Sequence, residues 1–218
     1  MKAKHAINLH KALTFGVILG LMILYHNFTI GPWVYLALHG TYGYLWLLKD
    51  RFYPDKQWEQ ETSIPQAAFI FGLVSLYWIA PFILISSGSI PPLPLVAIAI
   101  SLNILGVFLH FVSDAQKYYT LKYHQGLIAE GLFERCRNTN YLGEILIYTS
   151  FALLTQHWLP FLILGGFISM VFIPNMLKKD KSLSRYPEFA EYKRHSGLLF
   201  PLLFVPKTTN TQQTTASV

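Results

Sequence analysis

Six long apolar stretches, separated by short polar segments, limit what this chain can fold into more than any other feature. They cover Leu13–Ile30, Trp33–Leu48, Gln66–Ser86, Leu93–Val112, Tyr141–Leu159 and Phe161–Leu177. A helix of about 20 apolar residues crosses the ~30 Å hydrocarbon core of a bilayer, and most of these stretches approach that length. The sequence therefore predicts an all-α, polytopic helical membrane protein with about six transmembrane helices.

The composition leaves little room for a soluble domain. Of the 218 residues, 53% are hydrophobic and only 13% are charged, about half the charged fraction of an ordinary soluble domain. We therefore expect a single integral membrane domain over residues 1–206. The remainder, 207–218, is polar and without pattern, which is typical of a disordered tail.

The positions of Lys and Arg predict the orientation in the membrane. Basic residues lie before the first stretch, between the second and third, between the fourth and fifth, and after the sixth. None lies in the predicted turns at Gly31-Pro32, Ser87–Pro94 and His157–Pro160. By the positive-inside rule both termini and the long loops are cytoplasmic. The net charge of +6 reflects these flanks, and no nucleic-acid partner is predicted.

Polar residues gather at the start of the fifth stretch. Asn140, Gly143 and Glu144 are spaced to share one helix face, with Tyr141 beside them. A carboxylate inside an apolar span needs a partner, either a cation of the protein or a ligand. The plain structural role of Asn140 is to cap the helix, and Gly143 permits close approach of a ligand or another backbone.

A second group lies at the end of the fourth stretch. His110, Asp114 and Lys117 follow i, i+4 and i, i+3 spacing, so they share a face if the helix continues past the predicted span. The alternative is a simple Asp114–Lys117 ion pair at the membrane surface.

Two further segments carry unusual polar residues. The C-terminal stretch Arg185–Pro201 contains Tyr192, Arg194 and His195, and its alternative is an amphipathic helix at the headgroups. The second stretch contains His39 and Tyr42, for which the alternative is helix packing.

Three of these four groups map to the cytoplasmic side. Their mixture of Lys and Arg with carboxylates and amides suits a cytosolic cofactor that carries phosphates, which Arg grips well. The apolar remainder favours a lipid-like substrate. The chain contains no GxGxxG, GxxxxGK[ST], HExxH or CxxC motif, and no metal site is predicted.

The motifs resemble a known superfamily. Asp114-x-Gln116-Lys117, then Arg137-Asn-Thr-Asn140-Tyr141-x-Gly143-Glu144, then a basic and aromatic C-terminus, are similar to the steroid 5-alpha-reductases and sterol reductases, in particular their small bacterial relatives. The isoprenylcysteine carboxyl methyltransferases are a more distant branch. The resemblance covers roughly residues 100–205.

The resemblance implies a membrane enzyme that uses NADPH to reduce a carbon–carbon double bond in a steroid-like or other lipid. Carried over by position, the implied cofactor-binding residues are His110, Asp114, Lys117, Arg137, Asn140, Tyr141, Glu144, Tyr192, Arg194 and His195. Glu144 would orient the nicotinamide, and Tyr42 is the candidate proton donor. The cofactor-binding half would then span about 100–206.

Two departures from the superfamily keep alternatives open. Asn138-Thr139 stand where many relatives carry His-Pro, and His110 stands where the 5-alpha-reductase branch often has Asn. The methyltransferase branch, which uses S-adenosylmethionine, carries adjacent glutamates after the next span, whereas this chain has a lone Asp180 there. The remaining alternatives are therefore a methyltransferase and a non-enzymatic protein of the same fold.

Overall fold

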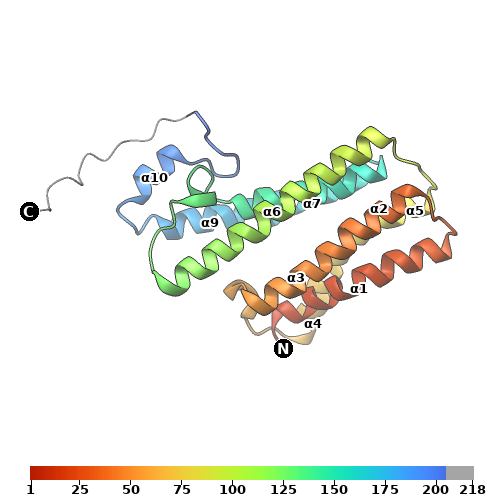
Figure 1. Ribbon diagram of the computed structural model, residues 1–218. Helices are drawn as coiled ribbons and strands as arrows, with labels where there is room; N and C mark the ends of the chain where they lie inside the picture. Colours follow the sequence, from red (N-terminus) through yellow and green to blue (C-terminus); the bar gives the residue numbers. More distant parts are fainter. Residues whose placement is uncertain (205–218) are drawn as a thin grey trace, which may run out of the picture.

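The protein is all-α over residues 1–204, the part of the chain that the computed structural model describes (Figure 1). The predicted polar tail at 207–218 lies outside the described residues. The helices are α1 (Ala3–Leu24), α2 (Ile30–Tyr35), α3 (Thr41–Phe52), α4 (Ile64–Ser75), α5 (Ile79–Ser86), α6 (Leu93–Tyr123), α7 (Thr139–Thr155), α8 (Leu159–Phe167), α9 (Ile173–Leu183) and α10 (Phe189–His195).

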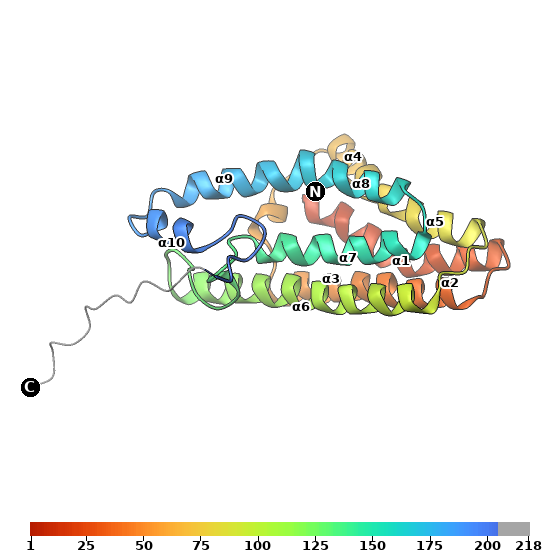
Figure 2. The ribbon, with the colours of Figure 1, turned by 90° about the horizontal axis from the view of Figure 1, so that it is seen from above.

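Several of these helices join end to end into longer rods. A π-helical turn at Leu36–Gly40 connects α2 to α3, and another at Ile168–Phe172 connects α8 to α9. A 3-10 turn at Leu76–Trp78 connects α4 to α5. The rods run roughly along one common direction (Figures 1 and 2).

Four helical rods in the described residues are long and apolar enough to cross a bilayer: Ala3–Leu24, Ile64–Ser86, Leu93–Tyr123 and Leu159–Leu183. The protein is therefore a polytopic helical membrane protein. The other two predicted spans are also helical, as α2–α3 and α7, but they do not meet these criteria. Helix α7 has only 17 residues.

Some predicted boundaries were wrong. Helix α1 begins at Ala3 rather than Leu13, because His10 and Lys11 are buried inside the bundle instead of lying in a polar flank. The first turn lies between Leu24 and Ile30, whereas Gly31 and Pro32 belong to the first turn of α2, where proline loses no helical hydrogen bond. Helix α6 continues to Tyr123, as the shared face of His110, Asp114 and Lys117 requires.

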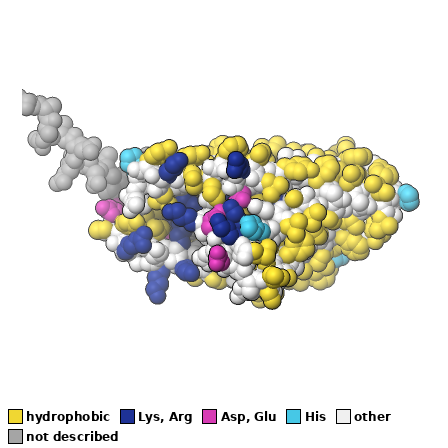
Figure 3. Space-filling view, turned by 90° about the horizontal axis from the view of Figure 1, so that it is seen from below, with side chains coloured by type: hydrophobic (Ala, Val, Ile, Leu, Met, Phe, Trp, Pro, Cys, Tyr) yellow, Lys and Arg dark blue, Asp and Glu magenta, His cyan; other side chains and the backbone are white. Residues whose placement is uncertain are grey.

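The two ends of the bundle differ. The segments 53–63 and 124–138 and helix α10 lie toward one end, and the short turns after α1, α5 and α7 lie at the other (Figure 1). On the face in Figure 3, Lys and Arg side chains gather on one half, and the opposite half is mainly hydrophobic.

Helices α6 and α7 pack unusually closely. A Cβ added at Gly106 would lie 2.6 Å from the Gly143 carbonyl oxygen, and one added at Gly143 would lie equally close to the Gly106 carbonyl. The sequence left open whether Gly143 faces a ligand or another backbone, and the structure shows a backbone. Helix α7 also contacts α5 and α8, so its buried face fixes the centre of the bundle.

Candidate functional site

A cavity of about 110 Å³ lies between α1, α3, α6, α7 and α9, beneath the segment 53–63. We call it the Glu144 cavity. Five residues singled out in the sequence line it: His110, Asp114, Asn140, Tyr141 and Glu144. Residues from two separate sequence motifs therefore meet in one place.

Glu144 lies one turn inside α7. Among the described residues, its carboxylate has no hydrogen bond and no cation within ion-pair distance. The cations that act on it electrostatically are Lys11 and Lys49. The carboxylate is therefore free to accept a hydrogen bond from a ligand.

Asp114 has a stronger partner than the sequence suggested. Lys49 Nζ of α3 lies 2.5 Å from Asp114 Oδ2, and both side chains are buried. Lys117 lies 3.8 Å from Asp114 but only 3.0 Å from Asp55. The predicted Asp114–Lys117 pair therefore exists, but it is the longer contact of a four-residue network. Burial raises the pKa of Asp55, but Lys117, the Gln57 backbone N–H and Lys49 together outweigh burial, so that the pKa of Asp55 is lowered.

Three polar atoms at this cavity are buried without a hydrogen-bond partner in residues 1–204: Asp114 Oδ1, His110 Nε2 and Asn140 Oδ1. The other ring nitrogen of His110 lies 3.1 Å from the Asn140 carbonyl oxygen. Buried polar groups are normally satisfied by a hydrogen bond, so three unsatisfied atoms around one cavity make it a candidate site for a polar ligand.

Asn140 does not cap its helix. The N-cap position of α7 belongs to Asn138, whose side-chain amide donates to the Leu198 carbonyl at 2.8 Å. Thr139 Oγ1 donates to the Leu132 carbonyl at 2.5 Å. Asn138 and Thr139 thus tie the start of α7 to neighbouring segments.

A second, basic cavity of about 130 Å³ lies near α10. It is lined by cations and aromatic rings, which include Lys117, Arg137, Lys179, Arg185, Tyr186 and Tyr192. The buried Tyr192 hydroxyl donates to the Phe133 carbonyl at 2.6 Å, and burial raises the pKa of Tyr192. We call this the basic cavity.

Arg137 is largely engaged by the protein itself. Its guanidinium forms a bidentate pair with Asp180, with Nε–Oδ1 and Nη2–Oδ2 distances of 3.0 Å. It also donates to the Ser196 carbonyl. Both charged side chains are nearly inaccessible, so this contact holds α9, α10 and the start of α7 together.

Three predicted site residues line neither the Glu144 cavity nor the basic cavity. Arg194 is exposed and pairs with Glu191, and His195 Nδ1 lies 3.0 Å from the Glu191 carbonyl oxygen. Tyr42 is fully buried behind the cavity, with the Lys11 ammonium 4.3 Å from its ring centroid.

A third cavity, of about 420 Å³, adjoins the other two. It shares Lys49, Asp55 and Asp114 with the Glu144 cavity, and Lys117 and Leu121 with the basic cavity. Lys56 and Lys122 add two cations to its lining. We call it the bridging cavity. Through these shared residues the three cavities adjoin one another from Glu144 to the region of α10, and we call this row of cavities the path.

Sequence reasoning missed Lys11, Lys49 and Tyr148, which also line the Glu144 cavity. The sequence alone places both lysines in the cytoplasmic flanks of the apolar stretches. Helical spacing could have identified Lys49 and Tyr148 in the sequence. Lys49 shares a helix face with Tyr42 and Trp46, and Tyr148 shares one with Glu144. Within residues 1–204, no three His, Cys, Asp or Glu side chains are grouped to hold a metal ion.

The segment between α3 and α4 covers the Glu144 cavity, to which it contributes Asp55, Gln57 and Trp58. Glu59 fastens this segment to the N-terminus, because Lys2 and Lys4 each lie 2.5 Å from its carboxylate. Hydrogen bonds from Lys2 and Lys4 lower the pKa of Glu59 from 4.5 to about 2.

This attachment predicts a pH effect. Because the folded pKa is the lower one, the attachment contributes fully above pH 4.5 and is lost as the pH falls toward 2. Acrylamide quenching of Trp58 fluorescence, with the other tryptophans replaced, should increase over this range. Glu59→Gln should show high quenching already at neutral pH, and an unchanged profile in that variant would contradict the prediction.

Comparison with known proteins places the chain in a family. Residues 49–196 match the family model described as "Protein of unknown function (DUF1295)". A stretch of 39 residues is 46% identical to part of the "Uncharacterized protein C7D4.09c" of Schizosaccharomyces pombe. This stretch is 18% of this chain and 14% of the yeast protein. No solved structure matches the chain significantly. The family match spans more than half of the chain and includes Asp114, Asn140 and Glu144, so the chain belongs to the DUF1295 family of membrane proteins.

Proposed function

We propose that this protein is a membrane-embedded, NADPH-dependent reductase of a carbon–carbon double bond in a steroid-like or other lipid substrate. The observation that carries the proposal is the path of three adjoining cavities, which begins at an unpaired carboxylate and is lined along its length by eight Lys and Arg residues. A phosphate-bearing dinucleotide needs hydrogen-bond acceptors for its carboxamide and sugar hydroxyls at one end of such a path and cations for its phosphates farther along it.

The residues present fit this cofactor. Asn140 Oδ1 and Asp114 Oδ1 are buried acceptors without donors, and Glu144 is a third acceptor, so together they would hold a carboxamide and sugar hydroxyls. Lys56, Lys117 and Lys122 of the bridging cavity would hold phosphates. When bound, the cofactor supplies hydride. The exposed Arg194 and the partly buried His195 would contribute only if α10 moved toward the path.

We also propose the finer topology. The chain would cross the membrane six times, with α2–α3 and α7 as the additional spans and both termini in the cytoplasm. The basic residues at one end support this orientation, which makes the cofactor site accessible from the cytoplasm.

An S-adenosylmethionine-dependent methyltransferase is the second candidate. Aromatic rings of Trp46, Tyr77 and Tyr148 line the Glu144 cavity, and a sulfonium is attracted to aromatic faces. The cations along the bridging cavity favour the reductase instead, because S-adenosylmethionine carries no phosphate. A non-enzymatic protein of the same fold is the third candidate.

Direct titration tests these candidates. The full-length protein in detergent is titrated with NADPH and, separately, with S-adenosylmethionine by calorimetry. We expect saturable NADPH binding that weakens about tenfold or more in Glu144→Gln, because a hydrogen bond to a charged group is lost. Glu188→Gln, at an exposed position of similar chemistry, should bind like the wild type.

The other possible results of the titration distinguish between the remaining candidate functions. Binding of S-adenosylmethionine alone would support the methyltransferase, and binding of neither would support the non-enzymatic protein. Arg194→Ala separates two versions of the reductase: weakened binding would mean that α10 closes over the cofactor, and unchanged binding would mean that the three cavities suffice.

A further inference from the structure

A buried lysine and a buried tyrosine form a pair in the Glu144 cavity. Lys11 Nζ of α1 donates a hydrogen bond to the Tyr148 hydroxyl of α7 at 2.9 Å. Both side chains line the cavity, although each residue is only 4% exposed. Tyr148 lies one helical turn beyond Glu144, so the two side chains share a face of α7.

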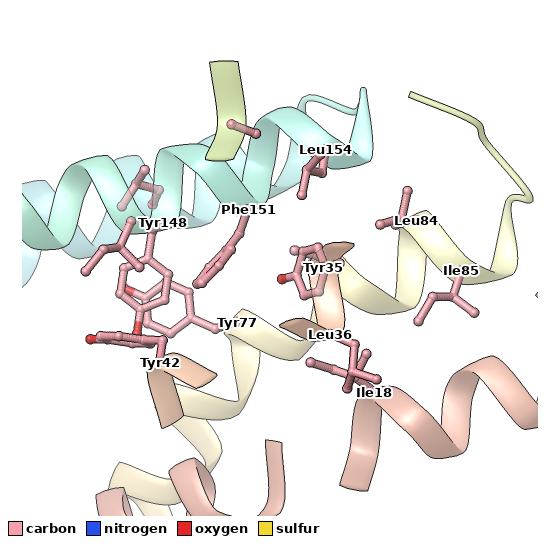
Figure 4. Close-up of a cluster of buried hydrophobic side chains, with 14 of the residues drawn as sticks. Ile18, Tyr35, Leu36, Tyr42, Tyr77, Leu84, Ile85, Tyr148, Phe151 and Leu154 are labelled. Atoms are coloured by element: carbon pink, nitrogen blue, oxygen red, sulfur yellow. The ribbon is translucent and has the colours of Figure 1, made fainter. Parts of the chain in front are cut away.

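Aromatic rings hold this pair in place. The Lys11 ammonium lies 4.3 Å from the ring centroid of Tyr42 and 5.3 Å from that of Trp46. The Tyr148 ring stacks on Tyr77 with centroids 3.7 Å apart, and Figure 4 shows Tyr42, Tyr77 and Tyr148 gathered together. A desolvated ammonium is stabilised by such rings. In residues 1–204, Lys11 has no carboxylate within ion-pair distance.

The direction of the hydrogen bond determines its chemistry. Lys11 can only donate, so the Tyr148 oxygen is the acceptor and its own proton remains available to a third group. A cation next to the oxygen stabilises negative charge there. Such a pair is organised to bind and neutralise an oxygen that becomes negative during a reaction.

We propose that the Tyr148 hydroxyl, positioned by Lys11, binds an oxygen of the substrate and stabilises the negative charge that develops on it. The assignment deepens the reductase proposed above and rests on it. Tyr148 is then the catalytic residue that touches the substrate, and Lys11 is a positioning residue. Tyr42, the donor expected from the sequence, lies behind the pair and supports Lys11.

The proposed reduction adds one hydride and one proton to the substrate. As the carbon distal to the substrate carbonyl takes up the hydride that the cofactor would supply, the electron pair of the double bond would move toward the carbonyl oxygen. Tyr148 gives its proton to that oxygen, which leaves a tyrosinate beside the Lys11 ammonium. The resulting enol becomes the saturated ketone, and water from the cytoplasm returns the proton to Tyr148.

The proposed oxyanion site, formed by the Tyr148 hydroxyl and Lys11, can be tested although the substrate is unknown. The probe is a phenol whose anion is coloured. The full-length protein in detergent is mixed with 4-nitrophenol at a pH below the ordinary pKa of the phenol. Empty micelles give the background. We expect the wild type to bind the phenolate, which is seen as the absorption band of the anion. Tyr148→Phe and Lys11→Met should each weaken phenolate binding about tenfold.

The controls separate an electrostatic role from a structural one. Tyr148→Phe keeps the ring that stacks on Tyr77. Tyr35→Phe makes the same change at a fully buried tyrosine whose hydroxyl contacts His39, and it should bind phenolate normally. The double variant Lys11→Met, Tyr148→Phe should lose less than the sum of the single losses, because the two residues act as one unit.

Several results would overturn the assignment. These are binding of the phenol only in its neutral form, unchanged phenolate binding in Tyr148→Phe, or loss of binding in Tyr42→Phe with Tyr148→Phe unaffected. An NADPH titration on the same samples keeps the two proposals apart. If NADPH binds normally but no phenolate binds, only the proposed role of Tyr148 is rejected. If phenolate binds but NADPH does not, the proposed reductase function is rejected.

Discussion

Replacing Asp180 by alanine is expected to destabilise the protein by about 3–5 kcal/mol, because it leaves the buried Arg137 guanidinium without its counter-charge. The side chains of Arg137 and Asp180 are only 5% and 11% exposed, so water cannot replace the lost partner. Thermal unfolding of the purified protein in detergent should show a clearly lower midpoint.

The exposed pair of Arg194 and Glu191 provides the matched control. Their side chains are 73% and 44% exposed, and such surface pairs contribute at most about 1 kcal/mol. Glu191→Ala should therefore leave the midpoint almost unchanged. If Asp180→Ala behaved like Glu191→Ala, the contact between α9 and the start of α7 would not hold this end of the bundle together.

Gly143→Ala is expected to cost about 1–3 kcal/mol or more by overpacking. The added methyl group would overlap the backbone nitrogen of His110 and lie 2.6 Å from the Gly106 carbonyl oxygen. Backbone atoms cannot rotate away, so α6 and α7 must separate. The contact between His110 and the Asn140 carbonyl should lengthen, and NADPH binding should weaken in parallel with the midpoint.

Gly16→Ala is the corresponding control in another apolar helix. Nothing lies within 4 Å of the Cβ that this change adds, and alanine favours helix over glycine by about 1 kcal/mol. We expect an equal or slightly higher unfolding midpoint. A similar loss in both variants would mean that the close α6–α7 contact has no special energetic role.

The helical membrane fold could be predicted because apolar length and charge position are local signals. The ends of α1 and α6 could not be predicted in the same way. Lys11 looks like a polar flank in the sequence, but the rings of Tyr42 and Trp46 hold its charge inside the bundle. Such stabilisation depends on residues far away in the chain, which hydropathy does not record.

The candidate site was only partly visible for a related reason. His110, Asp114, Asn140 and Glu144 stood out as polar groups in apolar surroundings, and they do line one cavity. Lys49 and Asp180 did not stand out, because each lies among other charged residues. Only the three-dimensional structure shows that one pairs with Asp114 and the other with Arg137. The roles of all these residues in binding remain predictions.

The π-helical turn at Leu36–Gly40 has a consequence for insertions and deletions. A π-helical turn holds one residue more than an α-helical turn, because its hydrogen bonds run from residue i to residue i+5. Removing a single residue here would therefore convert the turn to α-helix and leave α3 close to its present register, with Trp46 and Lys49 still facing the site and Lys49 still paired with Asp114. A one-residue shortening should be tolerated at Leu36–Gly40, although one residue advances a regular α-helix by about 100°.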